Sequence, residues 1–301
     1  FVWALGLGGK GFDAGGKVAA DDSGNVYVSG SFVGAMTIAG TELTSAGEGD
    51  AFVASFTSSG QLRWAKSIGG PGDDAAGPVA VDGAGRVYVG GSFAKQIDLG
   101  SEPLVSTGGV DAFLVSFDAE GALRWAKSFG SDGQDIVSDL AARGERVVCT
   151  GGFAGAGSID GTPLPVGQQD GFVASFDADG KLVWAKSFGG DGGDQGTAVD
   201  IGADDSIVLG GSIFRGPVFG GPVIDGPGYR SPFLAALDRD GELSWSRQLE
   251  STLAADVTGV AASPDGYAYF AGWFTDELTY DGETFTSKAA EDGLLLRVAP
   301  P

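Results

Sequence analysis

The sequence contains no histidine and only one cysteine among its 301 residues. Histidine-ligated metal or haem sites and a Ser-His-Asp triad are therefore excluded, as are an internal disulfide and a cysteine-cluster metal site. Basic residues are also scarce, because 18 Lys and Arg stand against 40 Asp and Glu, a formal net charge of −22. Such a field repels phosphate, so nucleic acid is not expected as a partner.

Long apolar stretches are absent as well. No run of about 18 apolar residues occurs, so no transmembrane segment is predicted. What the chain has instead is 43% hydrophobic residues, enough for a sizeable core, and 55 glycines. The glycines follow no three-residue period, which excludes a collagen-like chain and leaves a globular, glycine-rich fold.

A repeat of about 60 residues runs through the whole chain. Five tryptophans mark it, at spacings of 61, 61, 59 and 61 residues: Trp3, Trp64, Trp125, Trp184 and Trp245. The flanking segments match too, as in LRWAKSIGG at 62–70 and LVWAKSFGG at 182–190. We therefore divide the chain into five copies, at about 1–61, 62–122, 123–181, 182–242 and 243–301.

Each repeat predicts four short strands. In the second, they are Val79–Asp82, Val87–Phe93, Ala112–Phe117 and the tryptophan strand Ala122–Phe129, with an extra hairpin within Ile97–Val110. Short alternating runs rich in Val, Phe and Tyr, separated by Gly and Asp turns, are typical of antiparallel hairpins. No stretch has a sustained 3.6-residue period, so helix should be scarce.

Repeated four-stranded antiparallel units predict a β-propeller with one unit per blade. The fifth copy ends at Pro301, where its tryptophan strand would begin, and the chain starts with an orphan strand of that type, Phe1–Leu7. We therefore expect one all-β domain over residues 1–301, a five-bladed propeller whose N-terminal strand 1–7 completes the last blade. A transmembrane barrel needs longer strands, and an open solenoid leaves the split ends unexplained.

The repeat resembles the bacterial β-propeller repeat family. The resemblance is carried by a G-x-G-x-D loop, a V-A-V-D-x-x-G-x-V-Y-V-x-G-S-F run and a D-A-F-V-A-S-F-D-x-x-G-x-L-x-W run, most clearly at Gly72–Phe93 and Asp111–Trp125. The third and fifth copies depart from it, for example at Ala142, which replaces the aspartate that ends this strand in the second copy (Asp82). The resemblance implies a secreted or surface-tethered bacterial protein with a binding or scaffolding role, and it carries over no catalytic residues.

Two rows of aspartates recur with the repeat. The first row lies in the loop after each tryptophan strand: Asp13, Asp74, Asp135, Asp194 and Asp256. The second opens the third strand: Asp50, Asp111, Asp170 and Asp292, with Ser231 in the fourth copy. Because strand direction alternates, both rows should lie on one face. We consider these nine carboxylates as candidates for binding a ligand or a cation, with Ca²⁺ as the possible metal. Alternatively, each aspartate accepts backbone N–H bonds and holds its own loop.

Other recurring residues are expected to be structural. Acidic turns such as Asp177-Ala178-Asp179-Gly180 look like half an EF-hand loop but are expected to be hairpin turns. The basic residue two positions after each tryptophan, such as Lys66, should protect an edge strand from pairing. Three aromatics beside the predicted hairpins are instead candidates for contacts with a sugar ring or a partner: Trp273, Tyr229 and Tyr280.

Two classes of function remain open. The first is a non-enzymatic binding or scaffolding module, without a required cofactor, that presents an acidic loop face to a glycan, a protein or a cation at the cell surface. The second is a glycoside hydrolase using carboxylates at the channel mouth, which needs unlike acids at unique positions. The repeat symmetry of the acids favours the first. We expect a monomeric, extracytoplasmic ring, with any signal or anchor outside the printed chain.

Overall fold

The computed structural model describes residues 2–100, 102–164, 169–190, 192–220, 223–225, 230–288 and 290–299. All regular elements in these residues are β-strands, so the predicted all-β class is confirmed. They also contain no apolar helix of membrane-spanning length.

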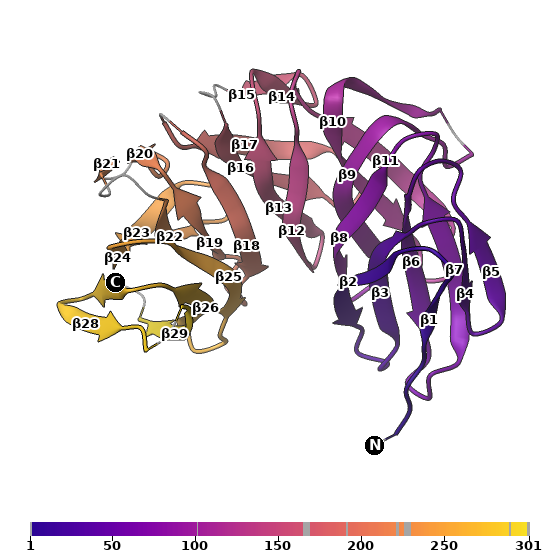
Figure 1. Cartoon of the computed structure of the whole chain (residues 1–301), viewed down its shortest axis with the longest axis horizontal. Helices are drawn as coiled ribbons and strands as arrows, with labels where there is room; N and C mark the ends of the chain where they lie inside the picture. Colours follow the sequence, from indigo (N-terminus) through magenta and orange to yellow (C-terminus); the bar gives the residue numbers. More distant parts are fainter. Residues whose placement is uncertain are drawn as a thin grey trace. The chain divides into compact units, whose positions relative to one another are not determined.

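The chain divides into two compact units, Phe1–Val147 with Asp177–Lys181, and Val148–Phe176 with Leu182–Pro301. Figure 1 shows the strands, coloured from indigo at the N-terminus to yellow at the C-terminus.

Four sheets have four strands each, as the repeat predicts. The first is β2 (Asp13–Ala20), β3 (Val26–Phe32), β6 (Asp50–Phe56) and β7 (Leu62–Ile68), and the second is β8 (Asp74–Val81), β9 (Val87–Ile97), β10 (Leu104–Phe117) and β11 (Leu123–Phe129). The third is β12 (Ile136–Arg143), β13 (Arg146–Phe153), β16 (Asp170–Asp177) and β17 (Leu182–Phe188). The fourth is β18 (Gln195–Ile201), β19 (Ile207–Ile213), β22 (Ser231–Leu237) and β23 (Leu243–Gln248). Each sheet thus takes three strands from one copy and the tryptophan strand of the next.

The fifth sheet has three strands: β25 (Ala255–Ala262), β26 (Ala268–Phe274) and β29 (Asp292–Val298). In the described residues β29 pairs only with β26. The segment 2–6 is not a strand, and β1 (Leu7–Gly9) pairs with β4 (Ala35–Ile38) of the first copy. The number of blades and the closure of a ring therefore stay predictions.

The expected extra hairpin appears in every copy. Four copies have separate short strands: β4 with β5 (Thr41–Thr44), β14 (Gly157–Ile159) with β15 (Thr162–Leu164), β20 (Arg215–Pro217) with β21 (Val223–Asp225), and β27 (Glu277–Tyr280) with β28 (Glu283–Thr286). In the second copy, the ends of β9 and β10 form it. A further short strand, β24 (Glu250–Ser251), follows β23 and pairs with β27.

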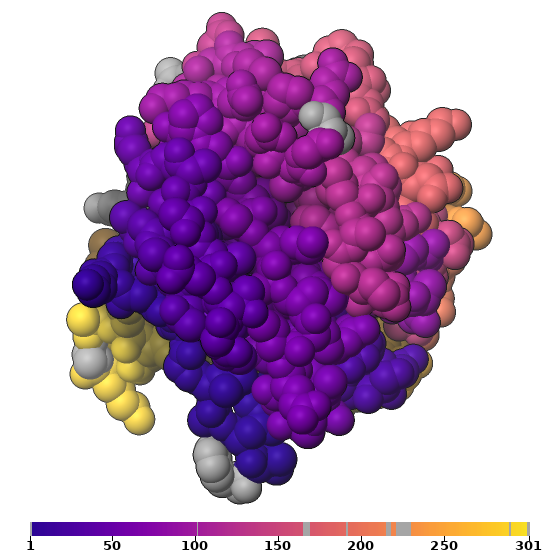
Figure 2. Space-filling view, turned by 90° about the vertical axis from the view of Figure 1, so that its right-hand side faces the viewer, coloured from indigo at the N-terminus to yellow at the C-terminus, as the bar shows by residue number. Residues whose placement is uncertain are grey.

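The cores lie between neighbouring sheets, because each blade is apolar on both faces. In the first unit, one cluster of buried side chains joins Tyr27 and Val53 of the first sheet to Val89 of the second. In the second unit, Leu234 of the fourth sheet and Phe270 of the fifth belong to one cluster. In the space-filling view, the indigo and purple residues of the first unit form a continuous packed surface (Figure 2).

Candidate functional site

The aspartates of the first row lie at the starts of the strands that begin each sheet. Asp13 and Asp74 are the first residues of β2 and β8, Asp135 and Asp194 directly precede β12 and β18, and Asp256 is the second residue of β25. Four of these carboxylates accept the backbone N–H of the residue four positions earlier. The donors are Gly9 to Asp13 (2.7 Å), Gly70 to Asp74 (2.8 Å), Ser131 to Asp135 (2.5 Å) and Gly190 to Asp194 (3.0 Å).

The second row repeats this contact. Backbone N–H groups four residues earlier donate to Asp50 (Ala46, 3.1 Å to Oδ2), Asp111 (Thr107, 3.0 Å) and Asp292 (Lys288, 3.0 Å). Among contacts between described residues, seven of the nine candidate aspartates thus hold the loop directly before them. This is the contact that the loop-holding interpretation predicts. Ligand binding at the same residues stays a prediction.

Carboxylates of the two rows meet around a glycine that follows a tryptophan strand, at Gly130 and at Gly189. A methyl group on Gly130 would lie 2.8 Å from Asp111 Oδ1 and 2.8 Å from Asp135 Oδ2, so both carboxylates flank the same backbone atom. A methyl group on Gly69 would lie 2.7 Å from Asp50 Oδ1, and the charge of Asp50 acts on Asp74. The members of these pairs are almost fully buried: Asp50 and Asp74 are each 1% exposed, and Asp135 is 1% exposed. They are therefore shielded from solvent by the loops that they hold.

Burial and a neighbouring carboxylate change the acidity of these pairs. Burial raises the pKa of Asp74 to about 6; the N–H groups of Gly70 and Ala94 oppose the rise, and the charge of Asp50 adds to it. Burial likewise raises the pKa of Asp194, to which the N–H groups of Gly190 and Phe214 donate. Asp74 and Asp194 therefore keep their protons more readily than an exposed aspartate does.

Asp256 differs from the rest of its row. Its Oδ1 accepts the N–H of the next residue, Val257, at 2.8 Å rather than one from the preceding loop. Burial raises its pKa to about 6, against the opposing effects of that bond and of Arg230. Arg230 directly precedes Ser231, which replaces the second-row aspartate of this copy. The fourth copy thus places a guanidinium near the first-row aspartate Asp256, where other copies place a second-row carboxylate near a first-row aspartate.

The aromatic candidates lie on separate elements. Trp273 is half-buried on β26, opposite Asp256 on β25 and Gly293 on β29. Tyr280 is half-buried at the end of β27, and burial raises its pKa. Tyr229 lies outside the described residues. The structure thus places Trp273, but not Tyr280, directly opposite a candidate carboxylate.

The acidic turns at the opposite ends of the strands are hairpin turns, as expected. Asp177 Oδ1 accepts the N–H groups of Asp179 (3.0 Å) and Lys181 (2.8 Å), which closes the turn without a metal ligand set. Within the described ranges, no three or more Asp, Glu or Cys side chains are grouped in a way that would hold one metal ion.

Comparisons with known proteins do not identify the family of the chain. No family model matches the chain. A segment of 105 residues is 30% identical to the regulatory protein FlaEY of Caulobacter vibrioides, covering 33% of this chain and 11% of that protein. The chain therefore spans only about a ninth of this relative.

Among solved structures, the chain is similar to a glycoside hydrolase of family 32 from Bifidobacterium adolescentis. The TM-score is 0.34 at 10% sequence identity, over 92% of this chain and 57% of that one.

Two features were missed in the sequence. Arg230 was not recognised as a neighbour of Asp256, although it stands directly before the one copy in which serine replaces the second-row aspartate. Phe219 was also overlooked. Phe219 precedes a glycine at a hairpin tip, where the first, third and fifth copies have Ala39, Asp160 and Asp281. A side chain as large as phenylalanine at this position was the signal that the sequence offered.

Proposed function

We propose that the chain is a non-enzymatic module that binds or scaffolds a glycan or a protein at the cell exterior. The observation that supports this most is the use of the recurring carboxylates. In the described part of the chain seven of the nine hold their own loops, and Asp50 and Asp74 are each 1% exposed. Acids that are buried and equivalent by repeat do not make the unlike, substrate-accessible pair that glycoside cleavage needs.

A paired assay tests this proposal. The purified chain is incubated with a panel of chromogenic glycosides and plant, fungal and bacterial polysaccharides, and both retained ligand and released reducing ends are measured. We expect retention of at least one ligand and no release of reducing ends. Sustained turnover that disappears in an acid-to-amide variant would show an enzyme instead.

The alternative, a glycoside hydrolase, is favoured by one observation. Asp256 is only partly buried, its pKa is raised to about 6, and it lies opposite Trp273 on the neighbouring strand β26. A carboxylic acid that keeps its proton near neutral pH is the usual general acid of these enzymes. If this alternative is correct, Asp256→Asn abolishes turnover, whereas the matched change Asp74→Asn at a buried position of the same row leaves residual turnover in the folded fraction.

We further propose that the chain forms a five-bladed ring closed by its N-terminal segment. This segment already makes the contacts of a tryptophan strand. Trp3 Nε1 donates to the carbonyl oxygen of Ser58 in the first sheet at 3.0 Å, as Trp64 of the first sheet does to Ala119 of the second at 2.9 Å. The pairing of β1 with β4 also matches that of β24 with β27. The segment thus contacts the first sheet as the tryptophan strand of a preceding sheet would.

The exposed faces of the first and fifth sheets support the same proposal. Val18 on β2 is 72% exposed, whereas Val79, at the same position of β8, is 6% exposed. Leu295 on β29 is 75% exposed, whereas Leu234, at the same position of β22, is 0% exposed. Such apolar sheet faces are buried wherever a neighbouring sheet covers them, and closure would cover both.

Register gives a direct test of closure. Val53 pairs with Lys66 in the first sheet, so the same register would pair Leu295 with Leu5. In a Cys149→Ser background, Leu5→Cys with Leu295→Cys should form an intrachain disulfide, detected as a faster-migrating monomer on non-reducing gels. Leu5→Cys with Phe285→Cys is the control. Disulfide-linked dimers or longer species from the first pair would contradict a monomeric ring.

We also propose the bacterial β-propeller repeat family and an extracytoplasmic location, on the motif resemblance alone. The test is protease accessibility of the chain in intact cells that express the gene with its native flanking sequence. Protection until the cells are lysed would contradict a surface location.

A further inference from the structure

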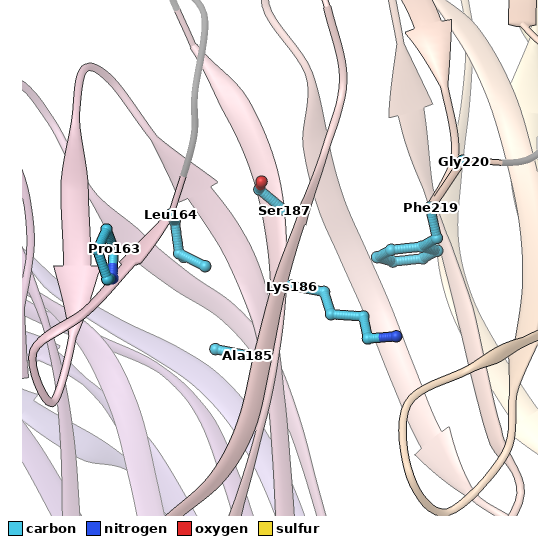
Figure 3. Close-up of a pocket in the computed structure, with 7 residues that line it drawn as sticks. All are labelled: Pro163, Leu164, Ala185, Lys186, Ser187, Phe219 and Gly220. Atoms are coloured by element: carbon cyan, nitrogen blue, oxygen red, sulfur yellow. The ribbon is translucent and has the colours of Figure 1, made fainter.

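An open pocket lies on the second unit beside the outer strand of the third sheet. Its volume is about 320 Å³, at the small end of the range of about 300–1,000 Å³ for ligand pockets. Its floor is the β17 segment Ala185–Ser187, and its walls are the β14–β15 hairpin, through Pro163 and Leu164, and the next hairpin, through Phe219 and Gly220. Figure 3 shows the Phe219 ring and the Lys186 side chain on the same side of β17.

Phe219 has a backbone conformation that is unfavourable for a large side chain. It has a φ of 51° and is followed by Gly220 with a φ of 75°, so two consecutive left-handed residues lie between β20 and β21. Asp160 and Asp281 occupy this position in other copies, with φ values of 48° and 52°. Aspartate tolerates this conformation, but a bulky residue is a marked outlier there. The fourth copy thus holds an aromatic ring at the pocket wall at a conformational cost.

The polar groups of the pocket are a cation and a hydroxyl. Lys186 Nζ donates to Glu242 Oε1 at 3.0 Å, and the Glu242 side chain is 75% exposed. An ion pair so open to solvent contributes little to stability, so its two charged groups can exchange partners with a ligand at low cost. Ser187 adds its hydroxyl group on the strand floor.

We propose that this pocket binds a neutral hexose unit of a glycan. An aromatic wall covers the C–H face of a sugar ring, while the ammonium of Lys186 and the carboxylate of Glu242 donate to and accept from adjacent hydroxyl groups. A net charge of −22 disfavours a polyanionic ligand, which makes a neutral sugar the best match. An extended peptide paired with the open edge of β17 fits less well, because Lys186 is the kind of side chain that blocks edge pairing. The inference rests on the proposed binding function and deepens it.

The probes are maltotriose, cellotriose, mannotriose and chitotriose, with trigalacturonate as the charged comparison. Binding to the full chain is measured by ligand-observed NMR and calorimetry. We expect at least one neutral trisaccharide to bind at millimolar concentration, and trigalacturonate to bind more weakly. Absence of binding by all four neutral probes, or a preference for trigalacturonate or for an extended peptide, overturns the proposal of a neutral sugar.

Matched variants locate the site. Phe219→Asn relieves the left-handed conformation but loses the contact of the Phe219 ring with Phe188, whose ring centroids are 5.1 Å apart. It should weaken sugar binding at least tenfold, and its Tm is measured alongside to show that the variant is folded at the temperature of the binding assay. Lys186→Gln should also weaken sugar binding at least tenfold. The controls Asp281→Asn, at the same turn position, and Lys66→Gln, at the same position of β7, should change affinity less than twofold. Equal binding by Phe219→Asn overturns this pocket but leaves the binding function standing, whereas release of reducing ends from the probes refutes the non-enzymatic function.

Discussion

The indole Nε1 of Trp64 in the first sheet donates a 2.9 Å hydrogen bond to the carbonyl oxygen of Ala119, in a turn of the second sheet. The same bond joins Trp125 to Ala178 and Trp184 to Arg239. The turn glycine packs against the indole; a methyl group on Gly121, for example, would lie 2.7 Å from an indole carbon of Trp64. These three tryptophans therefore connect the first sheet to the second, the second to the third and the third to the fourth.

Removing this bond should weaken the junction between sheets. Trp64→Phe keeps most of the ring packing but loses the Nε1 donor and leaves the Ala119 carbonyl without it. We expect a loss of about 1–2 kcal/mol in the free energy of unfolding, measured by chemical denaturation. Trp245→Phe is the control, because the Trp245 Nε1 makes no hydrogen bond to a described residue, and it should cost less. Equal losses at both positions would contradict a role for the bond.

Substituting the turn glycine should destabilise the protein more than its left-handed backbone conformation alone explains. Gly121 has a φ of +82° and lies against the Trp64 indole, whereas Gly40 has a φ of +88° with no atom within 4 Å of an added methyl group. Gly40→Ala measures the cost of a left-handed alanine, about 1 kcal/mol. Gly121→Ala should cost at least about 1 kcal/mol more because the indole must move. Thermal unfolding of the two variants gives the comparison, and matching Tm values would show that the indole yields freely.

Stability should increase on mild acidification. The pKa values of Asp74 and Asp256 are raised to about 6 in the folded protein, while an unfolded aspartate titrates near its ordinary value of about 3.9. The folded state therefore binds protons more tightly than the unfolded state does. The free energy of unfolding should rise as the pH falls from about 7 to about 4, by about 1.4 kcal/mol per unit of pKa difference.

Below about pH 4, the free energy of unfolding should fall as the pH falls further. The hydrogen bond from the Ser206 side chain lowers the pKa of Asp204, so stability from that carboxylate is lost as the pH falls through its folded value. Denaturation midpoints between pH 3 and 8 check both slopes. In Asp74→Asn, the rise on acidification should be smaller, and an unchanged rise would contradict the assignment to Asp74.

Calcium separates the two interpretations of the aspartate rows. If the carboxylates hold their loops, as the N–H bonds to Asp50 and Asp111 indicate, millimolar CaCl₂ should leave the Tm unchanged and EDTA should have no effect. Binding of Ca²⁺ to the folded state alone would raise the Tm in proportion to the logarithm of its concentration. MgCl₂ at equal ionic strength is the control. A rise specific to calcium and reversed by EDTA would support the cation site.

Local patterns predicted the strands well. The second-strand prediction Val87–Phe93 lies within β9, and Ala112–Phe117 lies within β10, because alternation and turn residues act over a few positions. The N-terminal prediction matched less well. Residues 2–6 are not in a strand, although Trp3 makes the expected type of contact, since a strand needs a hydrogen-bonded partner that local sequence does not supply.

The five copies, the all-β class and the positions of the two aspartate rows could be predicted from the chain alone, because all of these depend on periodicity and turn chemistry. The contacts that the aspartates make came from the folded structure. Asp111 and Asp135 are 24 positions apart, yet both flank Gly130 when the loops fold back. Their burial, the raised pKa of Asp74 and the different environment of Asp256 depend on which residues neighbouring copies bring close. Such long-range proximity is a property of packing, and no single repeat encodes it.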